Sequence, residues 1–199
     1  MALDEDKKTK LRQIAEQVRD LRESPLFEYR QENEYRPVVG EGDPDARILL
    51  VGEAPGAEEA KAGRPFVGRA GDVLDELLEG IGLRRDQVYI TSVLKDRPPG
   101  NRDPRAAEIR AYRPFLSEQI SVIQPEVIAT LGRFALKVIL DELKMPQRGE
   151  GLSDLHGRAL EADYGRVVVV PLYHPAAVFY NPDLQGTLEK DFQTLARFV

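Results

Sequence analysis

The hydrophobic residues of this chain gather in four short runs in which mostly apolar side chains follow one another. The runs cover residues 46–52 (ARILLVG), 87–94 (QVYITSVL), 126–131 (EVIATL) and 166–172 (RVVVVPL). Strands that are buried on both faces have this pattern, and they occur mainly in parallel sheets covered by helices on both sides. The four runs therefore predict the strands of a central parallel sheet.

The segments between these runs show the period of amphipathic helices. Residues 6–23 place apolar side chains at Leu11, Ile14, Ala15, Val18 and Leu21, with charged residues on the opposite face. Similar patterns cover residues 70–81, 104–123, 133–143 and 184–199, whereas residues 147–155 read as a surface loop. The alternation predicts a three-layer α/β/α fold with a central four-stranded parallel sheet. We expect a single domain over residues 1–199, with the helix of residues 1–23 packed on it.

The loops that follow the strands are where a site is expected, because ligands bind outside the carboxyl ends of strands in open parallel sheets. The first of these loops, residues 52–71, is rich in glycine and has neither a Walker ending nor a GxGxxG fingerprint. Within it, Phe66 either stacks on a flat heterocycle or fills a gap in the core. Glu53 directly follows the strand, where its carboxylate belongs either to a site or to a structural cap.

Two further loops have unusual composition. The segment KDRPPGNRDP (residues 95–104) is stiff and basic, and Asp103 is expected to cap a helix that begins at Pro104. Lys95 and its basic neighbours would then be exposed to a DNA backbone, the alternative being an ordinary turn that enters a helix. The segment YHPAAVFYNP (residues 173–182) contains His174 at the end of a buried strand, and its small and aromatic residues are suited to entering a DNA groove. The other histidine, His156, is interpreted as structural.

Composition changes this picture in two ways. The net charge of −6 argues mildly against a nucleic-acid partner, although residues 95–113 are locally basic. The sequence contains no cysteine, which excludes disulfides, thiolate ligands for a metal or iron-sulfur cluster, and a cysteine nucleophile. With no secretory signal or membrane span in the pattern, we expect a cytoplasmic protein without a membrane partner.

Taken together, GEAPG, GRPFVGRAG, KDRPPGNRDP and HPAA resemble the loops of the fourth family of uracil-DNA glycosylases, in the same order and positions. The resemblance implies an α/β/α fold and an enzyme of DNA repair that hydrolyses the N-glycosidic bond of a flipped-out uracil. Its partners would be uracil-containing DNA and free uracil as product, and we expect a monomer that needs no metal. A purely binding role towards uracil or abasic DNA, and an unrelated nucleotide-binding protein, are the alternatives.

The resemblance also implies a set of site residues. Glu53, with Glu59 as a second candidate, would handle water and charge, while His174 would donate a hydrogen bond to uracil O2 and Phe66 would stack on the base. The residues expected to bind uracil are Gly52, Ala54, Phe66, Ser92 and His174. The residues expected to bind DNA are Arg64, Arg69, Lys95, Arg97, Asn101, Arg102, Ala176 and Ala177.

The chain departs from this family's pattern in two respects. Leu21, Ser24, Asp96 and Tyr112 stand where the family usually has the four cysteines of an iron-sulfur cluster, so we expect no cofactor. Asp96, beside Arg97, would instead form a local ion pair or hydrogen bonds. Ser92 stands where the family usually has an asparagine that reads the O4 and N3 edge of uracil, which predicts weaker discrimination and leaves deaminated purines as possible substrates.

Overall fold

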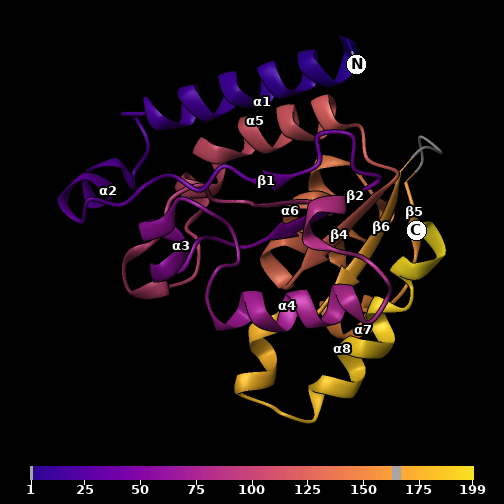
Figure 1. Cartoon of the computed structure of the whole chain (residues 1–199). Helices are drawn as coiled ribbons and strands as arrows, with labels where there is room; N and C mark the ends of the chain where they lie inside the picture. Colours follow the sequence, from indigo (N-terminus) through magenta and orange to yellow (C-terminus); the bar gives the residue numbers. More distant parts are fainter. Residues whose placement is uncertain (1, 163–166) are drawn as a thin grey trace.

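The computed structural model describes residues 2–162 and 167–199, and its centre is a six-stranded sheet in the order β1-β3-β2-β4-β6-β5 (Figure 1). The strands are β1 (Glu41–Gly42), β2 (Ile48–Gly52), β3 (Tyr89–Ser92), β4 (Val127–Leu131), β5 (Leu160–Glu161) and β6 (Val168–Leu172). The four middle strands are parallel, with Gly52 of β2 beside Ser92 of β3. The parallel sheet predicted from the apolar runs is therefore confirmed, although Arg166 at the start of the last run lies outside the described residues.

The expected count of four strands is corrected to six. Strand β1 pairs antiparallel with β3, and β5 pairs antiparallel with β6, so the sheet is mixed. Each of these edge strands has two residues, which is too short for a pattern of polar and apolar positions to reveal it.

Helices cover both faces of the sheet (Figure 1). On one face lie α1 (Ala2–Arg19), α5 (Ala106–Ile123) and α6 (Arg133–Glu142), and on the other lie α4 (Arg69–Glu79) and α8 (Leu184–Phe192). The shorter helices are α2 (Phe27–Glu32), α3 (Ala57–Ala62) and α7 (Leu152–Leu155). The 3₁₀ turns are η1 (Arg85–Gln87), η2 (Pro99–Asn101), η3 (Pro146–Gly149), η4 (Pro175–Phe179) and η5 (Leu195–Phe198).

The alternation of side chains along the central strands builds a core on each face. Leu49 and Val51 of β2 belong to the cluster under α1, α5 and α6, whereas Ile48 and Leu50 belong to the cluster under α4 and α8. All five residues of β2 are buried, which explains why this strand reads as a continuous apolar run.

Several predicted boundaries shift. The first helix covers residues 2–19 rather than 6–23, and the segment 147–155 contains parts of η3 and all of α7 rather than only a loop. The last helical pattern divides into α8 and η5. No helix among the described residues is both long and apolar enough to cross a membrane.

Candidate active site

The loops that leave β2, β3 and β6 converge on a cavity of about 380 Å³ at the carboxyl edge of the sheet. This volume falls in the range of small-molecule sites. The cavity is lined by nine of the residues expected from the sequence, namely Glu53, Ala54, Glu59, Phe66, Ser92, Asn101, Arg102, His174 and Ala176. Lining residues that the sequence did not single out are Val38, Pro55, Gly56, Pro65, Ala70, Pro98 and Tyr180.

Gly52 ends β2 at a point where no side chain fits. A Cβ atom there would lie 2.9 Å from the Phe66 ring and 3.1 Å from Ser92 Oγ. The absence of a side chain therefore lets the Phe66 ring and the Ser92 hydroxyl approach the end of the strand together.

Phe66 packs in the core, as one of its two readings from the sequence has it, and its side chain also lines the cavity, while stacking on a base stays a prediction. Its side chain is 7% exposed and belongs to the cluster under α4 and α8. Its ring is stacked with that of His174, which lies in the loop after β6. The backbone of Phe66 has a φ of 50°, in the left-handed region that non-glycine residues rarely occupy.

The environment of His174 fixes both its charge and its tautomer. Burial lowers the pKa of His174 to about 4, and the nearby Glu59 opposes this shift only in part. The Ala176 N–H donates a hydrogen bond of 3.1 Å to Nδ1, so the remaining proton of the neutral ring is on Nε2. The imidazole is thus a neutral hydrogen-bond donor.

The two candidate carboxylates have different surroundings. Burial raises the pKa of Glu53. The negative charge of Asp103 adds to this upward shift, and the positive charge of Arg133 opposes it. Glu59 is engaged in the loop itself, because its Oε1 accepts hydrogen bonds of 3.2 Å from the N–H groups of both Val67 and Gly68. Both carboxylates line the cavity, and Glu59 is the one that is tied to the loop backbone.

The expectation that Lys95 is exposed to DNA is wrong. Its side chain is fully buried, and its ammonium donates hydrogen bonds to Thr91 Oγ1 (2.7 Å), the Ser92 carbonyl (2.7 Å) and Gln119 Oε1 (2.6 Å). Burial lowers the pKa of Lys95 to about 7. Lys95 thus supports the strand end that carries Ser92, and it does not present a charge to a phosphate.

The other basic residues are more accessible but have partners within the chain. Arg64 is paired with Glu41, Arg69 lies over the Phe179 ring, and Arg102 is paired with the buried carboxylate of Glu108. Arg97 donates to Asn101 Oδ1 and to the hydroxyl of Tyr35.

The helix cap predicted after the basic loop is also corrected. Helix α5 begins at Ala106 with Arg105 at the N-cap, and the Glu108 carboxylate accepts a hydrogen bond from the Arg105 N–H. Asp103 pairs instead with Arg133 across the loop. His156, interpreted as structural, contacts the buried Asp191 through Nδ1 at 2.7 Å.

Tyr180 is the most unusual residue at the mouth of the cavity. It is 90% exposed, although large aromatic side chains are normally at least partly buried. Its neighbour Phe179 is 39% exposed and lies under the guanidinium of Arg69. The sequence signal for it was the aromatic pair in the loop after His174.

Comparison with known proteins decides the family. The family model described as the uracil DNA glycosylase superfamily matches residues 39–197. The chain belongs to the uracil-DNA glycosylase superfamily. The type-4 uracil-DNA glycosylase of Sulfurisphaera tokodaii is 44% identical over 93% of this chain and 83% of that protein. Those of Pyrobaculum aerophilum and Thermotoga maritima are 40% and 39% identical, over 91% and 94% of this chain and 90% and 93% of their own lengths. The resemblance to this type is thus confirmed.

In this glycosylase the positions of the family's cluster cysteines do not fit an iron-sulfur cluster. Ser24 Oγ and the Tyr112 hydroxyl lie 2.5 Å apart, and the same hydroxyl donates to Asp96 Oδ2 at 2.5 Å. Asp96 therefore makes hydrogen bonds, one of the two alternatives expected from the sequence, while its ion pair is with the buried Arg30 at 3.0 Å and not with the neighbouring Arg97. Leu21 packs against the core. The four positions therefore offer no thiolate, and three of them are hydrogen-bonded to one another.

Proposed function

We propose that this glycosylase hydrolyses the bond between uracil and deoxyribose in DNA, releasing free uracil and leaving an abasic site without cutting the strand. The observation that carries the proposal is the cavity that brings Glu53, Phe66, Ser92 and the neutral His174 together. No lysine side chain lines this cavity, so a lyase step through an amine is not part of the proposal.

The neutral His174 suits stabilisation of the leaving group. Cleavage leaves negative charge on uracil, and a donor already aimed at O2 stabilises that charge without reorganising. Nε2–H of His174 would be this donor, because Nδ1 already accepts from the Ala176 backbone. Phe66 would stack on the base, and the backbone at Gly52 and Ala54 would hold its edge.

Glu53 would act on the sugar side of the bond. The sugar becomes cation-like as the bond breaks, and a carboxylate held at the cavity wall stabilises this charge and orients the attacking water. Glu59 would contribute mainly by holding the loop, because its carboxylate accepts hydrogen bonds from two successive backbone N–H groups of the turn.

Contacts with DNA would surround the mouth of the cavity. Asn101, Arg102 and Ala176 line it, and Arg64, Arg69, Arg97 and Ala177 belong to the same loops. Tyr180 would stack on a base next to the extruded uracil, which gives a physical reason for its exposure. A monomeric protein in the cytoplasm is part of this proposal.

The test uses labelled oligonucleotides that contain one uracil, single-stranded and double-stranded, followed by alkali. A strand break that appears only after alkali is the expected result, because an abasic site is alkali-labile. Absence of this product on both substrates would contradict the proposal.

The second candidate is a module that binds uracil or abasic DNA with little turnover. Ser92 favours it, since a single hydroxyl replaces the amide that the family uses to read the base. Tight binding of uracil DNA without excision, in the same assay, would select this candidate.

A further inference from the structure

The turn that carries Phe66 needs support from outside its own sequence. Phe66 has a φ of 50°, a conformation that persists only where surrounding contacts hold it. The backbone of the turn packs directly against Gly71, because a Cβ atom at Gly71 would lie 1.9 Å from the Phe66 carbonyl oxygen. The position of the aromatic ring therefore depends on the residues that hydrogen-bond to the backbone of this turn.

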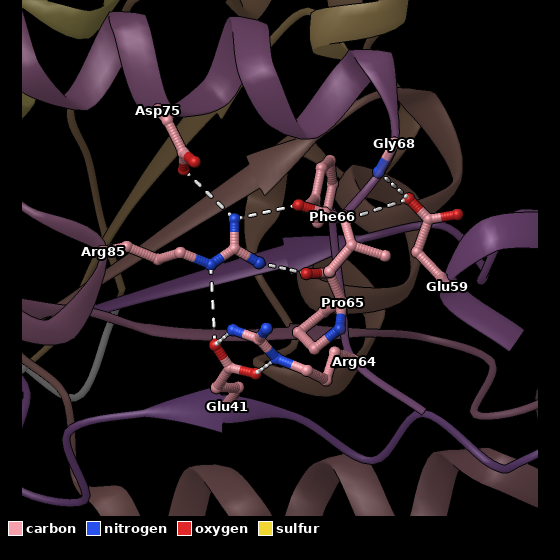
Figure 2. Close-up of polar contacts among 9 residues, drawn as sticks. Glu41, Glu59, Arg64, Pro65, Phe66, Gly68, Asp75 and Arg85 are labelled. Atoms are coloured by element: carbon pink, nitrogen blue, oxygen red, sulfur yellow. Dashed lines mark hydrogen bonds and ion pairs between the residues drawn. The ribbon is translucent and has the colours of Figure 1, made fainter. Parts of the chain in front are cut away.

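Arg85, in η1, donates hydrogen bonds to two successive carbonyl groups of the turn (Figure 2). Its Nη1 donates to the Phe66 carbonyl at 2.9 Å, and its Nη2 donates to the carbonyl of Pro65. A guanidinium can make both bonds at once because its donors form a rigid planar fork, whereas an ammonium has no such fork.

Two carboxylates hold this guanidinium in place. Asp75 Oδ1 of α4 lies 3.1 Å from Nη1, and Glu41 Oε1 of β1 lies 3.7 Å from Nε (Figure 2). Glu41 also pairs with Arg64, so the same carboxylate joins two arginines of the loop region. On the opposite side of the turn, Glu59 accepts from the N–H groups of Val67 and Gly68.

We infer that Arg85 is a positioning residue that acts on uracil excision through Phe66. It does not line the cavity, and it contacts the turn through the backbone carbonyls of Pro65 and Phe66. Since the left-handed backbone at Phe66 sets the direction of its ring, loss of the fork lets the ring leave the plane in which it stacks on the base. This inference rests on the proposed function of Phe66 and deepens it.

The test compares Arg85→Met, which keeps much of the side-chain stem, and Arg85→Lys, which keeps the charge. We expect single-turnover excision of uracil to fall roughly 10- to 100-fold in both, with Kd for undamaged DNA nearly unchanged. Arg84→Ala is the matched control, because Arg84 is the exposed neighbour and its side chain pairs with Asp86. This control should excise uracil like the parent protein.

A double-mutant cycle separates positioning through Phe66 from general damage. In a Phe66→Ala background, Arg85→Met should cost less than threefold, because the ring that Arg85 positions is already absent. An equally large loss in both backgrounds would overturn the inference. If Arg85→Met does not fold, the cycle is made with Arg85→Lys.

Failure of the proposed function is distinguishable from failure of this inference. An inactive parent protein would contradict excision itself, and the same cycle would then be read from Kd for uracil-containing DNA. The role of Arg85 would then be overturned by either of two results. One is a Kd for uracil-containing DNA that Arg85→Met leaves unchanged, and the other is a parent protein that does not bind this DNA.

Discussion

The ring of Phe66 is stacked with the imidazole of His174, with centroids 5.5 Å apart and planes inclined by 26°. Two residues that are distant in the sequence thus form one wall of the cavity, and the aromatic ring helps to exclude water from the imidazole. The exclusion of water is also the main cause of the low pKa of His174.

The titration of His174 can be observed directly. The chain has two histidines, so His174→Gln assigns the imidazole signals in a proton NMR titration. We expect the His174 signal to titrate near pH 4, since its pKa is lowered to about 4. An unfolded histidine titrates at about 6.5, so the folded state loses stability from this group as pH falls from 6.5 towards 4. A titration midpoint between 6 and 7 would contradict the neutral donor.

Replacement of Glu53 by glutamine removes the charge and little volume. We expect the single-turnover rate to fall about 10²- to 10⁴-fold, while Kd for uracil DNA stays within a few-fold. Glu58→Gln is the matched control, because Glu58 is exposed in the same loop and pairs with Lys61. Equal losses of rate and affinity in Glu53→Gln would indicate a folding defect instead of a catalytic role.

Ser92 is expected to weaken the discrimination of the glycosylase between uracil and other deaminated bases. An excision panel of uracil, hypoxanthine and xanthine, in single-stranded and double-stranded DNA, should show measurable activity on a purine. The change Ser92→Asn introduces an amide with both a donor and an acceptor, so it should shift the panel towards uracil. The prediction fails if the parent protein accepts uracil alone and Ser92→Asn is slower on every base.

Because of Lys95, the free energy of unfolding should increase as pH rises above neutral. Its folded pKa of about 7 lies below the usual lysine value of 10.5, so the unfolded chain binds more protons between these values. Stability from this group therefore rises with pH across that window. The difference in unfolding free energy between the parent protein and Lys95→Met should grow in favour of the parent from pH 7 to pH 10 in urea titrations. Lys137→Met, at an exposed lysine, should show no such trend, and a constant difference for Lys95→Met would refute the prediction.

The buried pair between Arg30 and Asp96 should be essential for stability. The side chains are 2% and 1% exposed, so Asp96→Ala leaves a buried guanidinium without its partner. We expect a loss of about 3–5 kcal/mol in the free energy of unfolding. Glu126→Ala, which breaks the exposed pair with Arg47, is the control and should cost much less. A loss of less than about 1 kcal/mol in Asp96→Ala, as expected of an exposed pair, would contradict the prediction.

The sequence by itself determined the central sheet and the place of the site. The buried strands are continuous apolar runs, and a strand buried on both faces needs no distant information to be recognised. The cavity residues Glu53, Phe66 and His174 follow such strands directly or lie in the loop after one, so their meeting at one edge follows from the parallel order.

Only the tertiary structure decided which charged groups are buried and what they contact. Lys95 reads as part of a basic loop, but its partner Gln119 comes from α5, and the partner of Asp96 comes from α2. The edge strand β1 likewise pairs with the distant β3, and the hydrogen bond from Arg85 to the Phe66 carbonyl joins residues 19 positions apart. Burial and pairing of a charge are properties of the neighbours that folding brings to it, and local sequence patterns record only which side chains need water and which avoid it.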